Sequence, residues 1–348
     1  MKHIIKRGCF LTLMFMLLGC LSLYAADNDL ITKQITINLE KAGTLPDRIG
    51  SSKKYKITNL KIIGEINGTD LRMIRDMAGS SSNGNSTDGK LSVLDLSKAK
   101  IVEGGDCYHI NYYTSNDVIG SYAFDGCSGL TNLTLPAGIT EIGEGAFFGC
   151  SGLTSLNLPA GITKIGSFAF LGCRGLTSLT LPAGITKIGD YAFQHCSGLT
   201  SLNLPAGITR IDDYAFSGCS GLTSLNLPAG ITSIGDEAFQ NCSGLTSIYV
   251  YAEKVPKIGS NVFGEVDAKK CTLYVPMGTY DDYWLSGFGD YFENIVEFEA
   301  TGIDKTTTST DVEEVARYSV NGQRLSAPTK GLNIVKYSDG SVKKVAVQ

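Results

Sequence analysis

A phrase of alternating apolar and polar residues recurs along the middle of the chain. Residues 150–163, 196–209 and 219–232 each read CSGLTSLNLPAGIT, and close variants begin at Cys127 and Cys173. Identity at a fixed spacing, here 23 residues, is typical of a solenoid whose stacked coils share one continuous core. The pattern therefore predicts a rod of coils in which equivalent residues lie directly over one another.

The spacing of apolar residues within one unit predicts its local structure. Leu156 and Leu158 flank Asn157, as in a strand with one buried face, and Pro159 then ends that strand. A compact helical or 3₁₀ turn is expected around Phe170, on the opposite side of the coil. We therefore predict an α/β solenoid, a right-handed coil with one parallel β-sheet of eight or nine strands. Phe147, Phe170 and Phe193 should share its core.

Degenerate segments flank the regular repeats and predict caps at both ends. Leu71, Ile74 and Met77 are spaced as on one helix face, with Thr69 or Asp70 as the helix cap. In the C-terminal cap, we expect Trp284 to help close the open core. The predicted organisation is a signal peptide 1–26, an N-terminal cap 27–118, regular repeats 119–256, a C-terminal cap 257–299, a linker 300–316 and a small β tail 317–348.

The first residues have the features of an export signal. Lys2 and Arg7 precede an apolar run that ends at Ala26, and small residues lie near the expected cleavage point. The alternative is lipidation, because Leu17-Leu18-Gly19-Cys20 resembles a bacterial lipobox. Apolar residues continue from 21 to 26, which favours cleavage near residue 25 or 26 over lipidation at Cys20.

Composition argues against several classes of function. Thirty Lys and Arg balance 34 Asp and Glu, and no basic block is present, so nucleic acid is not an expected partner. Only His109 and His195 lie outside the leader, and the sequence has no paired carboxylates, phosphate-binding loop or metal-ligand set. We therefore expect no enzyme activity, no cofactor and no metal.

Six cysteines recur at the repeat period, and their spacing in an exported protein raises the question of disulfides. Stacked coils would bring neighbouring Cα atoms within bonding range, but parallel Cβ vectors fit disulfide geometry poorly. We therefore predict buried free thiols at Cys127, Cys150, Cys173, Cys196, Cys219 and Cys242.

The repeat phrase resembles a known family. LTSLxLPxGIT, followed by IGxxAF and GC, is similar over residues 91–299 to the Treponema-type, BspA-like leucine-rich repeat proteins of bacterial surfaces. Residues 64–70 with 94–97 resemble the cap that accompanies these repeats in Bacteroides-type bacteria, and residues 317–348 resemble a degenerate type IX secretion tail. The resemblance implies a secreted, cell-surface or outer-membrane-associated protein of a Gram-negative bacterium. It also implies binding rather than catalysis, as in adhesion to host extracellular-matrix or bacterial surface proteins.

Three surfaces are candidates for such binding. The first is a stripe of positions at which the repeat copies differ. The second is a Tyr-rich insertion at 102–118. Both contain residue types, aromatic residues or Arg, that are enriched in binding hot spots. The third is the small, neutral and polar strand face. Alternatives are that Asp190–Lys187 and Asp213–Arg210 are ordinary surface pairs, that the insertion packs over the sheet edge, and that the strand face is simply solvated. Cys107 beside His109 is only a weak signal for a nucleophile and its base, because the two are close on a loop and no third orienting group is evident. The candidate residues are Lys164, Phe168, Lys187, Tyr191, Arg210 and Tyr214 in the stripe, and Tyr108, Tyr112 and Tyr113 in the insertion.

The sequence thus favours a non-catalytic scaffold for protein–protein interaction at the cell surface. A carbohydrate-binding protein that uses the polar strand face and the Tyr columns is the main alternative. The other alternative is a structural envelope component without a specific ligand.

Overall fold

The computed structural model describes residues 30–299 and, in the C-terminal tail, residues 314–319, 324–325, 327, 330–337 and 342–347. The predicted signal peptide with Cys20 and most of the predicted linker lie outside the described residues. The chain forms two units, one ending at Val296 and the other beginning at Glu297, and each is described by itself.

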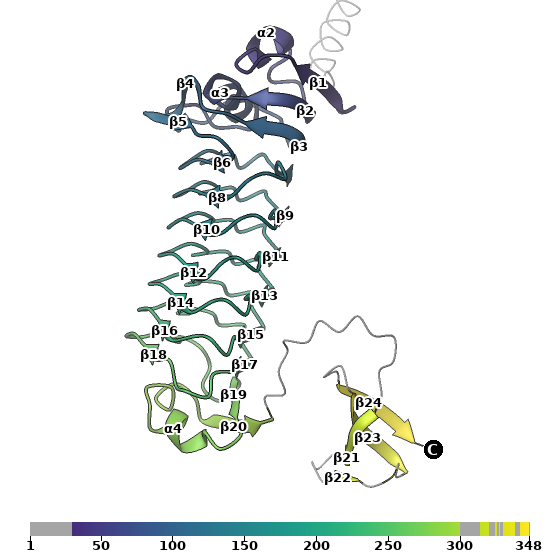
Figure 1. Ribbon diagram of the computed structural model, residues 1–348, viewed down its shortest axis with the longest axis vertical. Coiled ribbons are helices and arrows are strands. Elements are labelled where there is room, and N and C mark those ends of the chain that lie inside the picture. The colour runs from purple at the N-terminus through teal and green to yellow at the C-terminus, as the bar shows by residue number, and fades with distance from the viewer. Residues whose placement is uncertain are drawn as a thin grey trace, which may run out of the picture. The chain divides into compact units, whose positions relative to one another are not determined.

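One long sheet runs through the first unit and confirms the predicted solenoid (Figure 1). Neighbouring strands of this sheet from β1 to β19 are parallel. In the repeats, each strand residue is in register with the residue 23 positions later, as in Leu179 with Leu202 and Leu202 with Leu225. The sheet has eleven strands, more than the eight or nine predicted, because both caps add strands. In order they are β1 (Ile35–Leu39), β2 (Asn59–Ile66), β3 (Val93–Ile101), β7 (Asn132–Thr134), β9 (Ser155–Asn157), β11 (Ser178–Thr180), β13 (Ser201–Asn203), β15 (Ser224–Leu227), β17 (Ser247–Val250), β19 (Thr272–Pro276) and β20 (Asn294–Phe298).

The other side of each coil carries a two-residue strand and a compact turn. The turn has the predicted i→i+3 hydrogen bonds, such as Cys173 N to Phe170 O at 3.1 Å. The short strands were not predicted, since two residues leave no periodic pattern. They form two small parallel sheets, one of β6 (Val118–Ile119), β8 (Glu141–Ile142) and β10 (Lys164–Ile165), the other of β12 (Lys187–Ile188), β14 (Arg210–Ile211), β16 (Ser233–Ile234) and β18 (Lys257–Ile258).

A ladder of phenylalanines fills the core between the sheet and the turns. Phe147, Phe170 and Phe193 are fully buried, and their ring centroids lie 5.1 Å apart in successive coils. Leu and Ile from the strands pack around these rings. The proposition that equivalent positions stack is therefore confirmed. The complete ladder is Phe124, Phe147, Phe170, Phe193, Phe216, Phe239 and Phe263.

The N-terminal cap covers the first coil with α2 (Leu45–Ile49), α3 (Gly68–Met77) and the strands β1 to β3. The predicted helix is present, but its cap is Asn67 rather than Thr69 or Asp70. The Asn67 side chain accepts from the Thr69 N–H at 3.1 Å, and Asp70 accepts from the Asn67 N–H at 3.0 Å, which completes a capping box.

The C-terminal cap closes the core with α4 (Tyr280–Trp284) and the loop that follows it. Tyr283, Phe288 and Phe292 are buried there, and the Tyr283 hydroxyl donates to the Ala252 carbonyl at 2.6 Å. Trp284 is 46% exposed, so its predicted role in closing the core is wrong. Its neighbour Tyr283 faces the core instead, because successive positions on a helix point in different directions.

The six repeat cysteines are free and buried, as predicted. Each thiol from Cys150 onward donates to the carbonyl of the Phe 26 residues earlier, for example Cys196 Sγ to Phe170 O at 3.2 Å. Burial raises the pKa of Cys173 to about 12, so this thiol stays protonated at neutral pH and remains a donor. The column therefore links neighbouring coils through hydrogen bonds.

These thiols should be unreactive in the folded protein. In the chain from Asp27 onward, a chromogenic disulfide reagent at pH 8 should react rapidly only with the partly exposed Cys107. The seven buried thiols should appear after unfolding in denaturant without reductant. Recovery of few thiols in denaturant would contradict the assignment and indicate disulfides.

The second unit is a small antiparallel sheet with strand order β22-β21-β23-β24. Its first strand begins at Glu314, within the range predicted as linker. The strands are β21 (Glu314–Ser319), β22 (Arg324–Leu325), β23 (Gly331–Tyr337) and β24 (Val342–Val347).

Candidate functional site

The predicted aromatic stripe forms a stacked column on the turn side of the coils. The Phe168 and Tyr191 ring centroids lie 4.9 Å apart, and those of Tyr191 and Tyr214 lie 4.7 Å apart, with nearly parallel planes. All three rings are half-buried. The sequence prediction that these residues stack is therefore confirmed.

The backbone at this column has an unusual conformation that links the coils. Phe168, Tyr191 and Tyr214 have φ near +60°, the left-handed region that side chains other than Gly rarely adopt. In that conformation each amide N–H donates along the rod to the next coil, as from Tyr191 N to Asp213 O at 2.9 Å. The same column holds Gly145, with φ of 56°.

The stripe's cations also stack, but they are paired with acids that the sequence did not single out. Lys187 and Arg210 are in register on β12 and β14, and both side chains bind the carboxylate of Asp212, with Lys187 Nζ 2.6 Å from Oδ2. Asp212 is only 3% exposed and stands where the other coils have Gly. The predicted pairs of Lys187 with Asp190 and Arg210 with Asp213 are therefore wrong.

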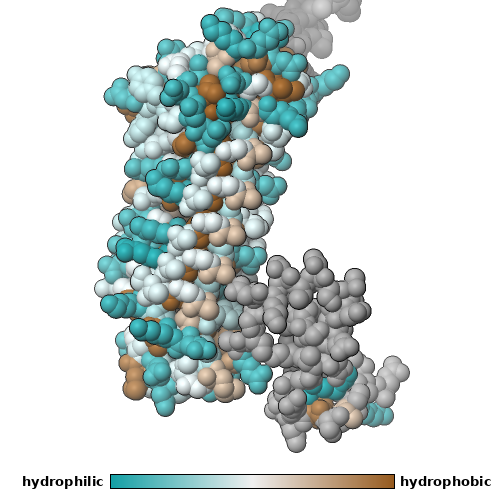
Figure 2. All heavy atoms as spheres, viewed as in Figure 1, coloured by the Kyte–Doolittle hydropathy of each residue, from teal (hydrophilic) through white to brown (hydrophobic). Residues whose placement is uncertain are grey.

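The remaining cation of the stripe, Lys164, pairs with Glu141 of the preceding coil at 2.6 Å. This pair is largely exposed, so it contributes little to stability. Hydrophilic side chains gather beside the coils on this edge of the rod (Figure 2).

A column of aspartates beside the aromatic column has a structural role. The Asp190 carboxylate accepts from the Asp213 N–H at 3.2 Å, and the Asp213 carboxylate accepts from the Asp236 N–H at 2.9 Å. These carboxylates thus act as acceptors between coils. Among the described residues, no group of three or more His, Cys, Asp or Glu side chains could hold a metal ion.

The Tyr-rich insertion forms a hairpin of β4 (Gly104–His109) and β5 (Tyr112–Thr114). At this end of the hairpin the side chain of Ile110 in the turn is 55% exposed, and those of Tyr112 and Tyr113 on β5 are 38% and 59% exposed. Ile110 has φ of 29° and Asn111 of 46°, a turn conformation that a β-branched residue adopts only at a cost. The fold therefore holds the apolar Ile110 at the tip in a backbone conformation that a β-branched residue disfavours.

The base of the hairpin is anchored in the N-terminal cap. Tyr108 is 1% exposed and its hydroxyl donates to the Ser121 carbonyl at 2.8 Å, so the predicted binding role of Tyr108 is wrong. Both ring nitrogens of His109 face other partners, Arg75 at Nδ1 and Asp125 at Nε2, rather than Cys107.

A buried arginine holds the hairpin, the cap helix and the first coil together. Arg75 Nη1 donates to the Tyr122 carbonyl at 2.7 Å, and Arg75 Nη2 donates to His109 Nδ1 at 3.0 Å. Because Nδ1 accepts, the proton of the neutral imidazole lies on Nε2, which is 3.4 Å from Asp125 Oδ2. Tyr112 stacks over His109 with a centroid separation of 6.2 Å, so the exposed ring rests on this network.

This network predicts that stability decreases in mild acid. Burial and then the Arg75 cation lower the pKa of His109 below 6.5, so the unfolded chain binds a proton at pH values where the folded chain does not. Stability should therefore fall as the pH drops from about 6.5 toward the lowered pKa. Burial raises the pKa of Asp125, and its proton uptake in the folded state offsets part of the loss at still lower pH.

The measurement is the free energy of unfolding between pH 7.5 and 5.5 for the wild-type chain and for His109→Gln. The variant should lose the part of the pH dependence that the imidazole contributes. An identical slope in both proteins would show that His109 does not titrate in this way.

The structure joins two surfaces that the sequence treats as separate. The Tyr112 and Tyr122 ring centroids are 5.2 Å apart, and Tyr122 is the first member of the left-handed column. A Cβ on Gly145 would lie 2.5 Å from the Tyr122 ring, so that ring occupies the space above Gly145. The hairpin tyrosine therefore begins the line that continues as Phe168, Tyr191 and Tyr214, and we call this set of five aromatic residues the aromatic edge.

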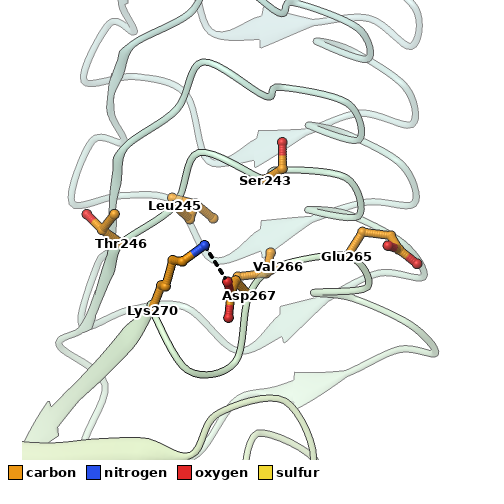
Figure 3. A pocket seen from close by; sticks show the side chains of 7 residues that line it. All are labelled: Ser243, Leu245, Thr246, Glu265, Val266, Asp267 and Lys270. Carbon is orange, nitrogen blue, oxygen red and sulfur yellow. Dashed lines mark ion pairs between the residues drawn. The ribbon is translucent and has the colours of Figure 1, made fainter.

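A shallow hollow of about 440 Å³ lies farther along the rod, where one coil is longer than the others. The β17 to β19 register advances 25 residues, from Ile248 to Leu273, and residues 265–267 and Lys270 of this longer coil line the hollow. Figure 3 shows the ion pair between Lys270 and Asp267, three residues apart on the same turn, with Nζ and Oδ2 2.9 Å apart. Two of the charged side chains that line the hollow therefore neutralise each other.

The repeat sequence decides the family. The family model described as BspA type leucine rich repeat region matches the chain in six copies, over residues 105–223 and 163–285. The chain belongs to the BspA-type leucine-rich repeat family. The stacked column, the Phe ladder and the Cys column all lie within the matched residues.

Solved structures of bacterial leucine-rich repeat proteins are similar to this BspA-type chain. A leucine-rich repeat protein of T. pallidum is 29% identical, with 45% of this chain and 72% of that chain covered and a TM-score of 0.39. A leucine-rich cell surface protein of Faecalibacterium prausnitzii is 29% identical, with 44% and 47% covered and a TM-score of 0.34. A leucine-rich repeat protein of Bacteroides ovatus is 20% identical, with 79% and 76% covered and a TM-score of 0.42. No curated protein matches.

The BspA-type solenoid is a protein-interaction scaffold, and its candidate surface is the aromatic edge. The sequence missed Ile110 and Asp212, because one is a single residue in a turn and the other replaces a Gly in a single coil. Among the described residues, no helix has the length and apolarity needed to cross a membrane.

Proposed function

We propose that this protein is an exported, surface-held scaffold that binds another protein through the aromatic edge and the hairpin tip. The observation that carries the proposal is the hairpin: Ile110, Tyr112 and Tyr113 are exposed on a base that Arg75 and Tyr108 fix. A rigid base lowers the entropy cost of binding, and aromatic anchors supply much of the energy of protein interfaces. Adhesion to host extracellular-matrix proteins or to bacterial surface proteins fits such a surface.

The cations of the stripe form a charged rim beside the aromatic edge. Lys187 and Arg210 are held by the buried Asp212, so little side-chain entropy is lost when they contact a partner. They would favour a partner with exposed carboxylates. Lys164 lies one coil earlier and extends the same rim.

The test is an array of immobilised matrix and bacterial surface proteins, probed with wild-type and variant chains. Ile110→Asn with Tyr113→Ser removes two exposed apolar side chains, and Asn relieves the turn conformation, so folding should be retained. We expect at least tenfold weaker binding. Met277→Ser with Leu285→Ser is the matched control, because these residues are also exposed and apolar but lie in the C-terminal cap.

A second variant tests the rim and the column together. Substitution of Lys187, Tyr191 and Arg210 should abolish binding to the same partner, with Asp212→Gly added so that no buried carboxylate is left unpaired. If both sets of variants bind normally, the partner contacts another surface and the aromatic edge is excluded. If the array gives no binding at all, a structural envelope role is favoured.

Export and anchoring need their own measurement. Mass spectrometry of the mature N-terminus distinguishes cleavage near residue 26 from lipidation at Cys20. Deletion of residues 300–348 tests the tail, because loss of surface display would support a type IX sorting role and unchanged display would exclude it.

A further inference from the structure

The outer face of the long sheet has a second set of aligned side chains, apart from the aromatic edge. Alternate strand positions point outward, and from β7 to β19 these positions carry no charged residue. The Leu and Ile between them face the core. One outward row, set by the strand register, runs Thr134, Asn157, Thr180, Asn203, Asn226, Tyr249 and Tyr274.

The last two members of this row form an aromatic pair. Tyr249 on β17 and Tyr274 on β19 are in register, and their ring centroids lie 4.3 Å apart at an interplanar angle of 6°. Both are half-buried on the sheet face, since Ile248 and Leu273 beside them take the inward positions. Burial is the main cause that raises the pKa of Tyr249, and the neighbouring Tyr274 raises it further. The phenol therefore remains neutral.

Side-chain amides lie directly beside the pair. Asn226 is in register with Tyr249, and Asn203 is in register with Asn226. Within residues 30–299 the side chains of Asn203 and Asn226 make no hydrogen bond, whereas the Thr200 and Thr223 hydroxyls donate to carbonyls of the preceding coil. The amides therefore offer both donors and acceptors to a ligand.

We propose that the row Asn203, Asn226, Tyr249 and Tyr274 binds a neutral carbohydrate. A pyranose has apolar C–H groups that pack against aromatic side chains and hydroxyls that bond to amides, and this row supplies both aromatic and amide side chains. The absence of charged residues at the outward positions from β7 to β19 disfavours acidic glycans and nucleic acid. An extended peptide is disfavoured because backbone groups in the middle of a sheet are already paired, so it could not add as a strand.

The experiment screens the purified full chain against neutral oligosaccharides, with sialylated and sulfated glycans and neutral peptides on the same array. Calorimetry then measures the affinity for the best neutral ligand. Tyr249→Thr, Tyr274→Thr and Asn226→Thr place in the row a residue that it already contains at Thr134 and Thr180, so the strands should be retained. Trp284→Ala is the matched control, because Trp284 also stacks on a Tyr, Tyr280, but lies in the C-terminal cap.

We expect each Tyr variant to bind the neutral glycan about tenfold more weakly, and Asn226→Thr several-fold more weakly. Trp284→Ala should bind as wild type. The proposal is overturned if no neutral glycan binds, if only acidic glycans or peptides bind, or if the row variants keep wild-type affinity. Ile110→Asn with Tyr113→Ser should leave glycan binding unchanged, so failure of the protein-binding proposal and failure of this one are distinguishable.

Discussion

Replacing Phe193 with Ala should lower the free energy of unfolding by about 3 to 5 kcal/mol. Phe193 is fully buried and stacks on Phe170 and Phe216, each with a centroid separation of 5.1 Å. The cavity would lie in the middle of the ladder, where the coils on either side are held by their own hydrogen bonds and can collapse only partly. Urea unfolding followed by circular dichroism measures the loss.

Tyr191→Ala is the matched control for this prediction. Tyr191 lies in the same coil and also stacks on two neighbouring rings, but its ring is half-buried on the surface. The loss should be about 1 kcal/mol, the value of aromatic stacking without full burial. Equal losses in the two variants would mean that ring stacking, rather than burial in the core, determines the stability of the rod.

The sequence predicts the repeat region well, because a fixed period specifies the register of the sheet. A residue and its copy 23 positions later must occupy equivalent places, so Phe170 and Phe193 share a core whatever the detailed path of the coil. The same logic correctly predicts free Cys thiols and a stacked Phe168, Tyr191 and Tyr214.

The caps are less predictable because they have no copies to compare. β1 and β20 each occur once, so nothing in the sequence shows that they extend the repeat sheet. Trp284 and Tyr283 are neighbours with similar chemistry, and which of them faces the core depends on where α4 begins. Asn67 is the helix cap because α3 begins at Gly68, earlier than its apolar spacing indicates.

The candidate site depends on contacts between distant residues. The sequence identifies Tyr112 and Tyr191 as members of separate surfaces, and only the turn of the hairpin onto Tyr122 joins them. Asp212 differs from the repeat by a single position, yet its buried carboxylate decides how Lys187 and Arg210 are held. Spacing alone gives no side-chain direction at such irregular positions.

Arg75→Met should destabilise the protein by about 3 to 5 kcal/mol, and this loss should be centred on the N-terminal cap. Arg75 donates to the carbonyls of Tyr122 and Ser81 as well as to His109, and Met can donate to none of them. Each buried acceptor left without a donor costs roughly 1 to 3 kcal/mol. Removing a buried cation also relieves a desolvation penalty, but the charge now bonds to several carbonyls, so the lost hydrogen bonds outweigh that relief.

Arg72→Met on the same helix is the control, because Arg72 is exposed and its replacement should change stability by less than about 0.5 kcal/mol. A second measurement separates a local from a general effect. In Arg75→Met the pKa of His109, followed by NMR, should rise, because the cation that opposes protonation of the imidazole is gone. Equal stability of the two variants, or a His109 pKa that does not rise, would mean that Arg75 does not hold the hairpin on the first coil, and the exposed tip would then lack the rigid base that makes it a binding surface.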